Sequence, residues 1–250
     1  MSLGAHLIEL RKRLFLAALA IVIGSIAGFL VSDFVLAAMI RPISELAAEQ
    51  NRNASLNFTD VSSAFDLRIQ IAFTVGVVIS SPVWLHQLWA FVMPGLKKNE
   101  KRYAIGFVAA AVPLFLAGCA AGWFVLPHMV TLLTGFAPEG TTALLTARSY
   151  FDFVLKLVLA IGIAFVLPVF LVLLNFAGVL TAKAILKSWR IAILAVTLFT
   201  AIATPAADVM SMFLLAIPMI GLYFLAAGIA WLHDRRAARI AARLDLELAV

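Results

Sequence analysis

The chain has 250 residues, of which 64% are hydrophobic and only 13% are charged. A soluble domain of this size needs a largely polar exterior, so the composition excludes a soluble globular protein and predicts several membrane spans. The net charge of +6 does not indicate nucleic-acid binding, because the bases stand in short segments between apolar runs and form no continuous basic face.

The first predicted span is the charge-free window at residues 14–32, which follows the segment HLIELRKRLF at residues 6–15. This window is too long for the core of a secretory signal peptide and lacks a convincing cleavage site, so we expect a retained helix. Within it, Gly24 and Gly28 form a GxxxG pair, which favours close packing against another helix.

Five more apolar windows follow along the chain. A helix of about 20 apolar residues crosses roughly 30 Å of hydrocarbon, and most of these windows are long enough. They are residues 69–91, 103–127, 157–180, 191–203 and 209–232. Residues 191–203 are short, but TPAAD at 204–208 is typical of a tight turn, so the sequence predicts two short helices joined by a hairpin.

The predicted fold is therefore an all-α polytopic membrane protein with six transmembrane helices, of which the last two are short. We expect one membrane domain over residues 1–232 and a polar cytoplasmic tail over 233–250. Pro113, Pro168 and Pro218 fall within apolar windows, where each removes a backbone donor and favours a kink.

The orientation is predicted from the positions of Lys and Arg. With six spans both termini share one side, and fourteen of the nineteen bases fall on it. These bases are Arg11, Lys12, Arg13, Lys97, Lys98, Lys101, Arg102, Lys183, Lys187, Arg190, Arg235, Arg236, Arg239 and Arg243. Because positive residues are retained in the cytoplasm, we expect both termini to be cytoplasmic.

Catalytic and metal-binding motifs are missing from the sequence. It contains no GxSxG, HExxH or P-loop pattern, and Cys119 is its single cysteine, so no enzyme activity and no cofactor are predicted. A small-solute secondary transporter remains an alternative function. It would require polar or charged groups that converge near the membrane midplane, and the apolar windows offer few.

Two acids have unusual positions. Glu9 and Glu100 each stand among bases, in ELRKR and LKKNEKR, a few residues before a span. One explanation is local ion pairing, such as Glu9 with Arg13 one helical turn later. The other is that two carboxylates at one membrane face each bind a guanidinium group through forked hydrogen bonds.

Four segments together resemble the TatC family, the C subunit of the twin-arginine protein translocase. They are HLIELRKRL at 6–14, SPVWLHQLWAFVMPGLKKNEKR at 81–102, APEG at 137–140 and TPAADVMSMFLLAIPM at 204–219. The resemblance runs from residue 6 to about residue 232. It implies a non-enzymatic receptor of the cytoplasmic membrane that recognises paired-arginine signal peptides of folded cargo. It also implies single-span partner subunits, TatA and usually TatB, an oligomeric assembly, and transport driven by the proton gradient or membrane potential.

The resemblance also implies roles for individual residues on the cytoplasmic face. Glu9 and Glu100 match the acids implicated in holding the signal arginines. Arg11 and Phe91 match further positions that are important on the same face. Glu9 would then be one half of a receptor for two guanidinium groups.

Other matched positions concern partners and the external face. Pro42 and Asp208 match external positions, and Thr204 matches part of a polar patch on the fifth span that is associated with partner docking. The chain departs from the family at two places. Val166 stands where many members have Glu or Gln, so a role for an intramembrane acid does not transfer to this chain. Met212 stands where many members have Gln, so the polar patch is smaller in this chain.

Overall fold

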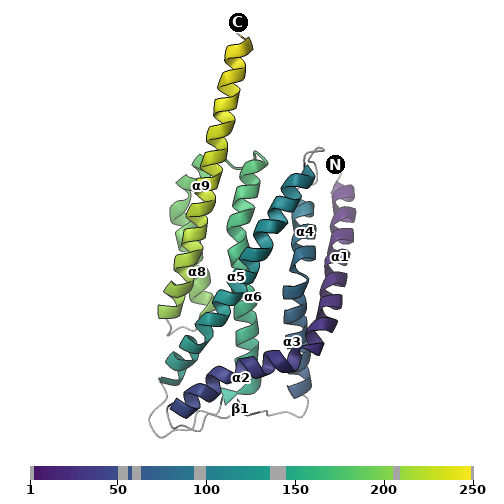
Figure 1. The fold of residues 1–250 in the computed structure, drawn as a ribbon, viewed down its shortest axis with the longest axis vertical. Helices are drawn as coiled ribbons and strands as arrows, with labels where there is room; N and C mark the ends of the chain where they lie inside the picture. The colour runs from purple at the N-terminus through teal and green to yellow at the C-terminus, as the bar shows by residue number, and fades with distance from the viewer. Residues whose placement is uncertain are drawn as a thin grey trace. The chain divides into compact units, whose positions relative to one another are not determined.

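The computed structural model describes residues 3–49, 56–57, 63–92, 100–135, 145–204 and 209–248, and almost all of them are helical. The predicted helical class is therefore confirmed (Figure 1). In chain order the elements are α1 (Leu3–Leu30), α2 (Ser32–Glu49), β1 (Leu56–Asn57), α3 (Ser63–Ile79), α4 (Ser81–Val92), α5 (Glu100–Gly135), β2 (Leu145–Thr146), α6 (Ala147–Phe176), α7 (Ala182–Lys187), α8 (Trp189–Ala203) and α9 (Val209–Leu248).

Helices long and apolar enough to cross a membrane lie where the sequence predicts them. In the described part of the chain four helices qualify singly: α1, α5, α6 and α9. α3 and α4 together give a fifth candidate if the bent pair is one span, and α8 is a shorter apolar helix of 15 residues. A multi-pass membrane protein is thus the outcome, while the sixth crossing requires α8 to span and stays a prediction.

The span predicted at residues 69–91 differs from expectation because it is broken. α3 and α4 meet at Ser80 with a bend of 62°. Pro82 has no N–H to continue the helical ladder, and the indole Nε1 of Trp84 donates to the Val77 carbonyl at 2.9 Å. By contrast, the helices that contain Pro113, Pro168 and Pro218 continue on both sides of the proline.

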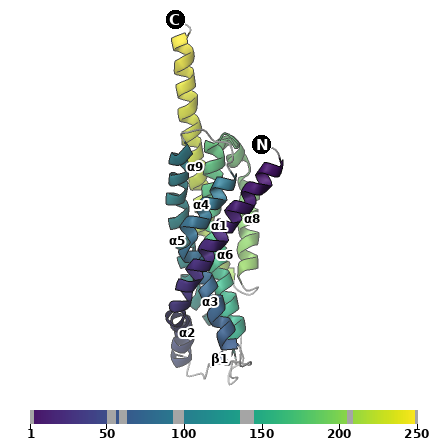
Figure 2. The ribbon, with the colours of Figure 1, turned by 90° about the vertical axis from the view of Figure 1, so that its right-hand side faces the viewer.

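The chain divides into two compact units, Met1–Ile163 and Ala164–Val250. In the first unit α1 lies against α3 and α4, which Figures 1 and 2 show from two sides. The α1 and α3 backbones approach so closely that a Cβ on Gly24 would lie 2.6 Å from the Gly76 carbonyl oxygen, and one on Gly28 would overlap the Ala72 carbonyl oxygen. The packing role predicted for the first GxxxG pair is confirmed.

A buried cluster joins α2, α3 and the beginning of α6 within the same unit. Met39, Ile71, Phe151 and Val154 are fully buried there, and the Tyr150 hydroxyl donates to the Met39 carbonyl at 3.0 Å. Nearby, β1 and β2 form a short parallel pair. These contacts hold together the end of the unit opposite to the amino terminus of α1.

The second unit is built around α9, which packs against α7 and α8. Ile185 of α7 is buried with Tyr223, Ala227 and Ala230 of α9. Residues 205–208, where the turn between the two short spans is predicted, lie outside the described residues. The polar tail predicted from residue 233 begins as a continuation of α9, whose last turns extend beyond α8 in Figure 1.

We predict that Gly24→Ala destabilises the first unit by about 1–3 kcal/mol, because the added methyl group has no space between α1 and α3. The measurement is the thermal unfolding of the purified chain in detergent. Gly106→Ala is the matched control, since a Cβ at this α5 glycine meets nothing within 4 Å. Equal unfolding temperatures for the two variants would contradict the close packing.

Candidate functional site

A groove of about 470 Å³ lies between α1 and α4 in the first unit. The α1 side chains that line it are related by spacings of three and four residues, so they occupy one face of that helix. The lining residues are Ile8, Glu9, Lys12, Arg13 and Leu16 from α1, and His86 and Gln87 from α4. The site thus combines a carboxylate and two basic side chains with polar groups from a second helix. Ile8 and Leu16 contribute apolar surface to it.

Glu9 is paired with Arg13 inside this groove. The Arg13 guanidinium donates to Glu9 Oε1 from Nη2 at 2.6 Å and from Nε at 3.0 Å. Its third nitrogen, Nη1, lies 3.5 Å from the amide oxygen of Gln87. The two charged side chains are 23% and 26% exposed, so the pair is half-buried and retains some contact with solvent.

The second carboxylate oxygen, Oε2 of Glu9, accepts no hydrogen bond from the part of the chain that the structure describes. A carboxylate can accept from two guanidinium groups at once, because it has about four lone-pair positions. The groove therefore offers an acceptor that is partly satisfied by the protein's own arginine. The local ion pair expected from the spacing of Glu9 and Arg13 is confirmed.

Aromatic contacts position the groove relative to the neighbouring helices. His6 of α1 stacks on Phe91 of α4 with ring centroids 4.6 Å apart. Trp89 of α4 stacks on Phe107 of α5 at 6.4 Å. α5 begins at Glu100, about two turns before Phe107, so the backbone of Glu100 belongs to the same end of the first unit as the groove.

The other predicted cytoplasmic residues have different surroundings. Arg11 is exposed on α1, and Phe91 is half-buried against His6. The side chain of Glu100 lies outside the described residues, so the meeting of two carboxylates stays a prediction.

None of the residues predicted for external or partner roles is among the described residues that line the groove. Pro42 falls within α2, although its side chain lies outside the described residues, as does the whole of Asp208. Thr204 is buried at the carboxyl end of α8, and its hydroxyl donates to the Thr200 carbonyl at 2.8 Å. Thr200 likewise donates to the Val196 carbonyl, so both hydroxyls are satisfied within their own helix.

One polar cluster was only partly predicted from sequence. Asn175, a polar residue within the apolar window at residues 157–180, donates from Nδ2 to Asp234 Oδ1 and to the Leu180 carbonyl, both at 2.9 Å. Asp234 Oδ2 also accepts from the Ala182 backbone N–H at 2.7 Å. Asp234 therefore fastens α9 to the end of α6 and to the first residue of α7. The only sequence signal was a lone Asn in an apolar window, since Asp234 itself resembled a tail residue.

No cluster of three or more His, Cys, Asp or Glu side chains suited to a metal ion occurs among the described residues. The groove chemistry consists of ion pairing and hydrogen bonding between a carboxylate and guanidinium groups. Together with the apolar helices, these features describe a membrane protein with a groove lined by charged and polar side chains.

Comparison with known proteins identifies the class. The family model described as Sec-independent protein translocase protein (TatC) matches residues 5–218. A TatC from Xylanimonas cellulosilytica is 46% identical over 96% of this chain and 87% of its own length. TatCy from Bacillus subtilis is 31% identical over 97% of this chain and 93% of its own length.

A solved structure gives the same result at the level of the fold. The crystal structure of the twin arginine translocase receptor TatC in DDM matches with a TM-score of 0.77 and 34% identity, covering 90% of this chain and 99% of that one. The chain belongs to the TatC family of Sec-independent protein translocase subunits. It is accordingly a multi-pass protein-transport component and not an enzyme, and the alternative of a small-solute transporter is set aside.

Proposed function

We propose that the chain is the receptor subunit of a twin-arginine translocase and binds paired-arginine signal peptides in the groove between α1 and α4. The observation that carries this proposal is the Glu9–Arg13 pair, in which an arginine guanidinium already occupies the carboxylate of a half-open groove. Membership of the TatC family and likeness to a twin arginine translocase receptor support the same assignment.

The preference for arginine follows from the geometry of its side chain. A planar guanidinium presents parallel N–H donors that match a carboxylate, whereas the lysine ammonium acts as a compact point charge. Glu9 has one oxygen engaged by Arg13 and a second oxygen that accepts from none of the described residues. A signal arginine can bind this second oxygen or displace Arg13.

Glu100 is the proposed second acid. It stands at the first position of α5, where the helix dipole favours a negative charge, and Trp89 links the beginning of that helix to α4. Two consecutive arginines would thus find one carboxylate from α1 and one from α5. Arg11 and Phe91 complete the proposed signal-peptide site.

The proposed assembly lies in the cytoplasmic membrane. The apolar windows support six crossings, with α8 as a short fifth span, and the distribution of Lys and Arg supports cytoplasmic termini. Family membership supports association with TatA and TatB, oligomerisation, and the use of the proton motive force to move folded proteins. Thr204 on α8 is the proposed partner position, while Pro42 and Asp208 are assigned to the external face.

Neutralising the acids tests the receptor assignment. We expect Glu9→Gln and Glu100→Gln each to weaken binding of a synthetic paired-arginine signal peptide about ten- to a hundred-fold, because a charged hydrogen-bond partner is lost. The double variant should also lose most of the discrimination between paired-arginine and paired-lysine peptides. Binding is measured by fluorescence titration of the full chain in nanodiscs.

Asp33→Asn is the control for charge, because it removes a carboxylate from an exposed ion pair with Arg68 at the other end of the same unit. Its peptide affinity should equal that of the parent. If the double Gln variant binds both peptides as the parent does, Glu9 and Glu100 are only local ion-pair partners and the proposed receptor site is wrong.

Arg13→Gln should have the opposite effect on binding. The substitution removes the internal competitor for Glu9, and a half-exposed ion pair is worth about 0–1 kcal/mol, so the paired-arginine peptide should bind up to about fivefold tighter. Lys12→Gln is the matched control, since it removes one positive charge from the same groove without releasing Glu9. Weaker binding by Arg13→Gln than by Lys12→Gln would mean that Arg13 positions Glu9 or contacts the peptide.

The orientation is tested by cysteine labelling in a Cys119→Ser background. We expect Gln50→Cys and Ile240→Cys to react with a membrane-impermeant maleimide from opposite sides of sealed vesicles, because six crossings place residue 240 in the cytoplasm and residue 50 outside. Labelling of both positions from one side would refute the topology.

A further inference from the structure

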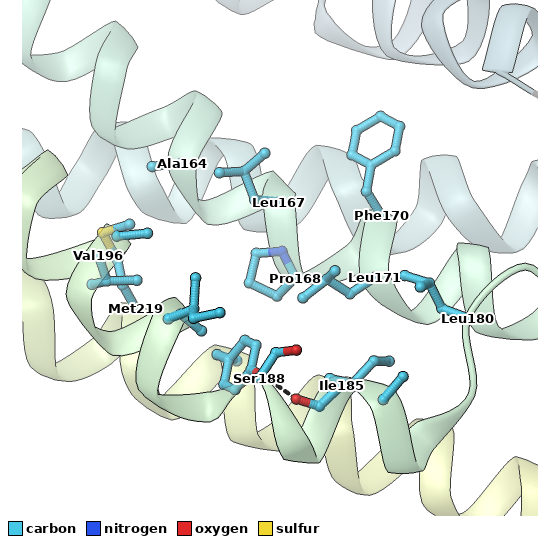
Figure 3. A pocket seen from close by; sticks show the side chains of 15 residues that line it. Ala164, Leu167, Pro168, Phe170, Leu171, Leu180, Ile185, Ser188, Val196 and Met219 are labelled. Carbon is cyan, nitrogen blue, oxygen red and sulfur yellow. Dashed lines mark hydrogen bonds between the residues drawn. The ribbon is translucent and has the colours of Figure 1, made fainter.

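A second groove, with a volume of about 450 Å³, lies in the second unit and is lined by α6, α7, α8 and α9. Figure 3 shows Leu167, Pro168 and Leu171 of α6 on one side, with Ile185 and Ser188 across the space from them. The groove is open rather than enclosed. It is independent of the signal-peptide site, all of whose described lining residues belong to the first unit.

The lining is almost entirely apolar. Of its side chains only Ser188 and Tyr223 carry a polar atom, and the Tyr223 hydroxyl already donates to the Ile185 carbonyl. Water in this space would therefore have few hydrogen-bond partners, while an empty groove would forfeit dispersion contacts. The groove suits an apolar chain.

One end of the groove lies at the level expected for lipid headgroups. Ser188 marks this end, and the next residue, Trp189, is 43% exposed and carries the Arg190 guanidinium 5.4 Å from its ring centroid. Trp side chains accumulate at the membrane–water interface. From Ser188 the lining continues along α8 to Val196, about 12 Å deeper into the apolar part of the helix.

Two bases flank this end without a carboxylate partner among the described residues. Lys187 directly precedes Ser188, Arg190 directly precedes the lining residue Ile191, and both bases are exposed. Asp234 accepts hydrogen bonds from the Ala182 N–H and from Asn175, and Ala182 directly precedes Lys183. Because the Asp234 carboxylate binds next to Lys183 along the chain, the uncompensated positive charge is that of Lys187 and Arg190.

We propose that this groove binds an anionic phospholipid, with one acyl chain along α6 and α8 and the phosphate between Lys187 and Arg190. The apolar lining accounts for the chain, and the unpaired bases at the interfacial end account for selection of a negative headgroup. A partner helix is a poorer occupant, because an apolar helix would leave these two charges uncompensated at its end. The bound lipid would then be a resident part of the second unit.

The experiment uses the full chain in detergent, with dioleoyl phosphatidylglycerol and dioleoyl phosphatidylcholine as probes and native mass spectrometry to count retained lipids. The parent should bind phosphatidylglycerol at least about tenfold more tightly. Lys187→Gln/Arg190→Gln should bring phosphatidylglycerol to the level of phosphatidylcholine, since each interfacial base contributes about fivefold. Arg236→Gln/Arg239→Gln is the control, which removes the same charge from exposed positions of α9 that do not line the groove.

A second pair of variants tests the acyl chain. Ala195→Phe fills the groove from an exposed position on α8 and should reduce retention of both lipids, while Ala201→Phe on the same helix, outside the groove, should not. If Ala195→Phe lowers the unfolding temperature, Ile191→Gln replaces it as the test variant. This substitution makes the lining polar from another exposed position and should also reduce retention of both lipids. Equal binding of the two lipids by the parent, or equal retention by the groove variants and their controls, would overturn the proposal.

Discussion

The contact on which the candidate receptor site depends is the direct approach of the α1 and α3 backbones. With no side chain at Gly24 or Gly76, the two helices come together until the Gly76 carbonyl occupies the place of a missing Cβ. α4 follows α3 after a bend at Ser80, so the position of α1 against α3 also sets its position against α4. The groove that contains Glu9 lies between these two helices. α1 lines it with basic side chains as well as Glu9, and α4 lines it with His86 and Gln87.

Most of the helices could be predicted from the sequence, because a bilayer demands long apolar windows and charge marks their ends. The break at Ser80 could not, since the window at residues 69–91 has no charge and Pro82 resembles the other prolines within spans. What distinguishes Pro82 is a tertiary detail, the Trp84 indole that satisfies a carbonyl next to the break. Prolines 113, 168 and 218 lack any comparable effect on the continuity of their helices.

The candidate site was predicted in part for a similar reason. A spacing of four residues is enough to pair Glu9 with Arg13 on a helix, so that contact follows from the sequence. The contribution of His86 and Gln87 depends on how α4 lies against α1, which no local pattern specifies. Asp234 shows the same limit, because its partners Asn175 and Ala182 are more than fifty residues away along the chain.

The continuity of α9 has a mechanical consequence. A helix of 40 residues is about 60 Å long, roughly twice the hydrocarbon thickness, and Asp234 lies about two-thirds of the way along it. The polar part of α9, from residue 233, is therefore a stiff arm that continues the apolar part as one helix through residue 248. Asp234 links this arm to the amino end of α7, because its carboxylate accepts a hydrogen bond of 2.7 Å from the Ala182 backbone N–H. The arm therefore has a fixed attachment to a second helix of the same unit, at the point where its polar part begins.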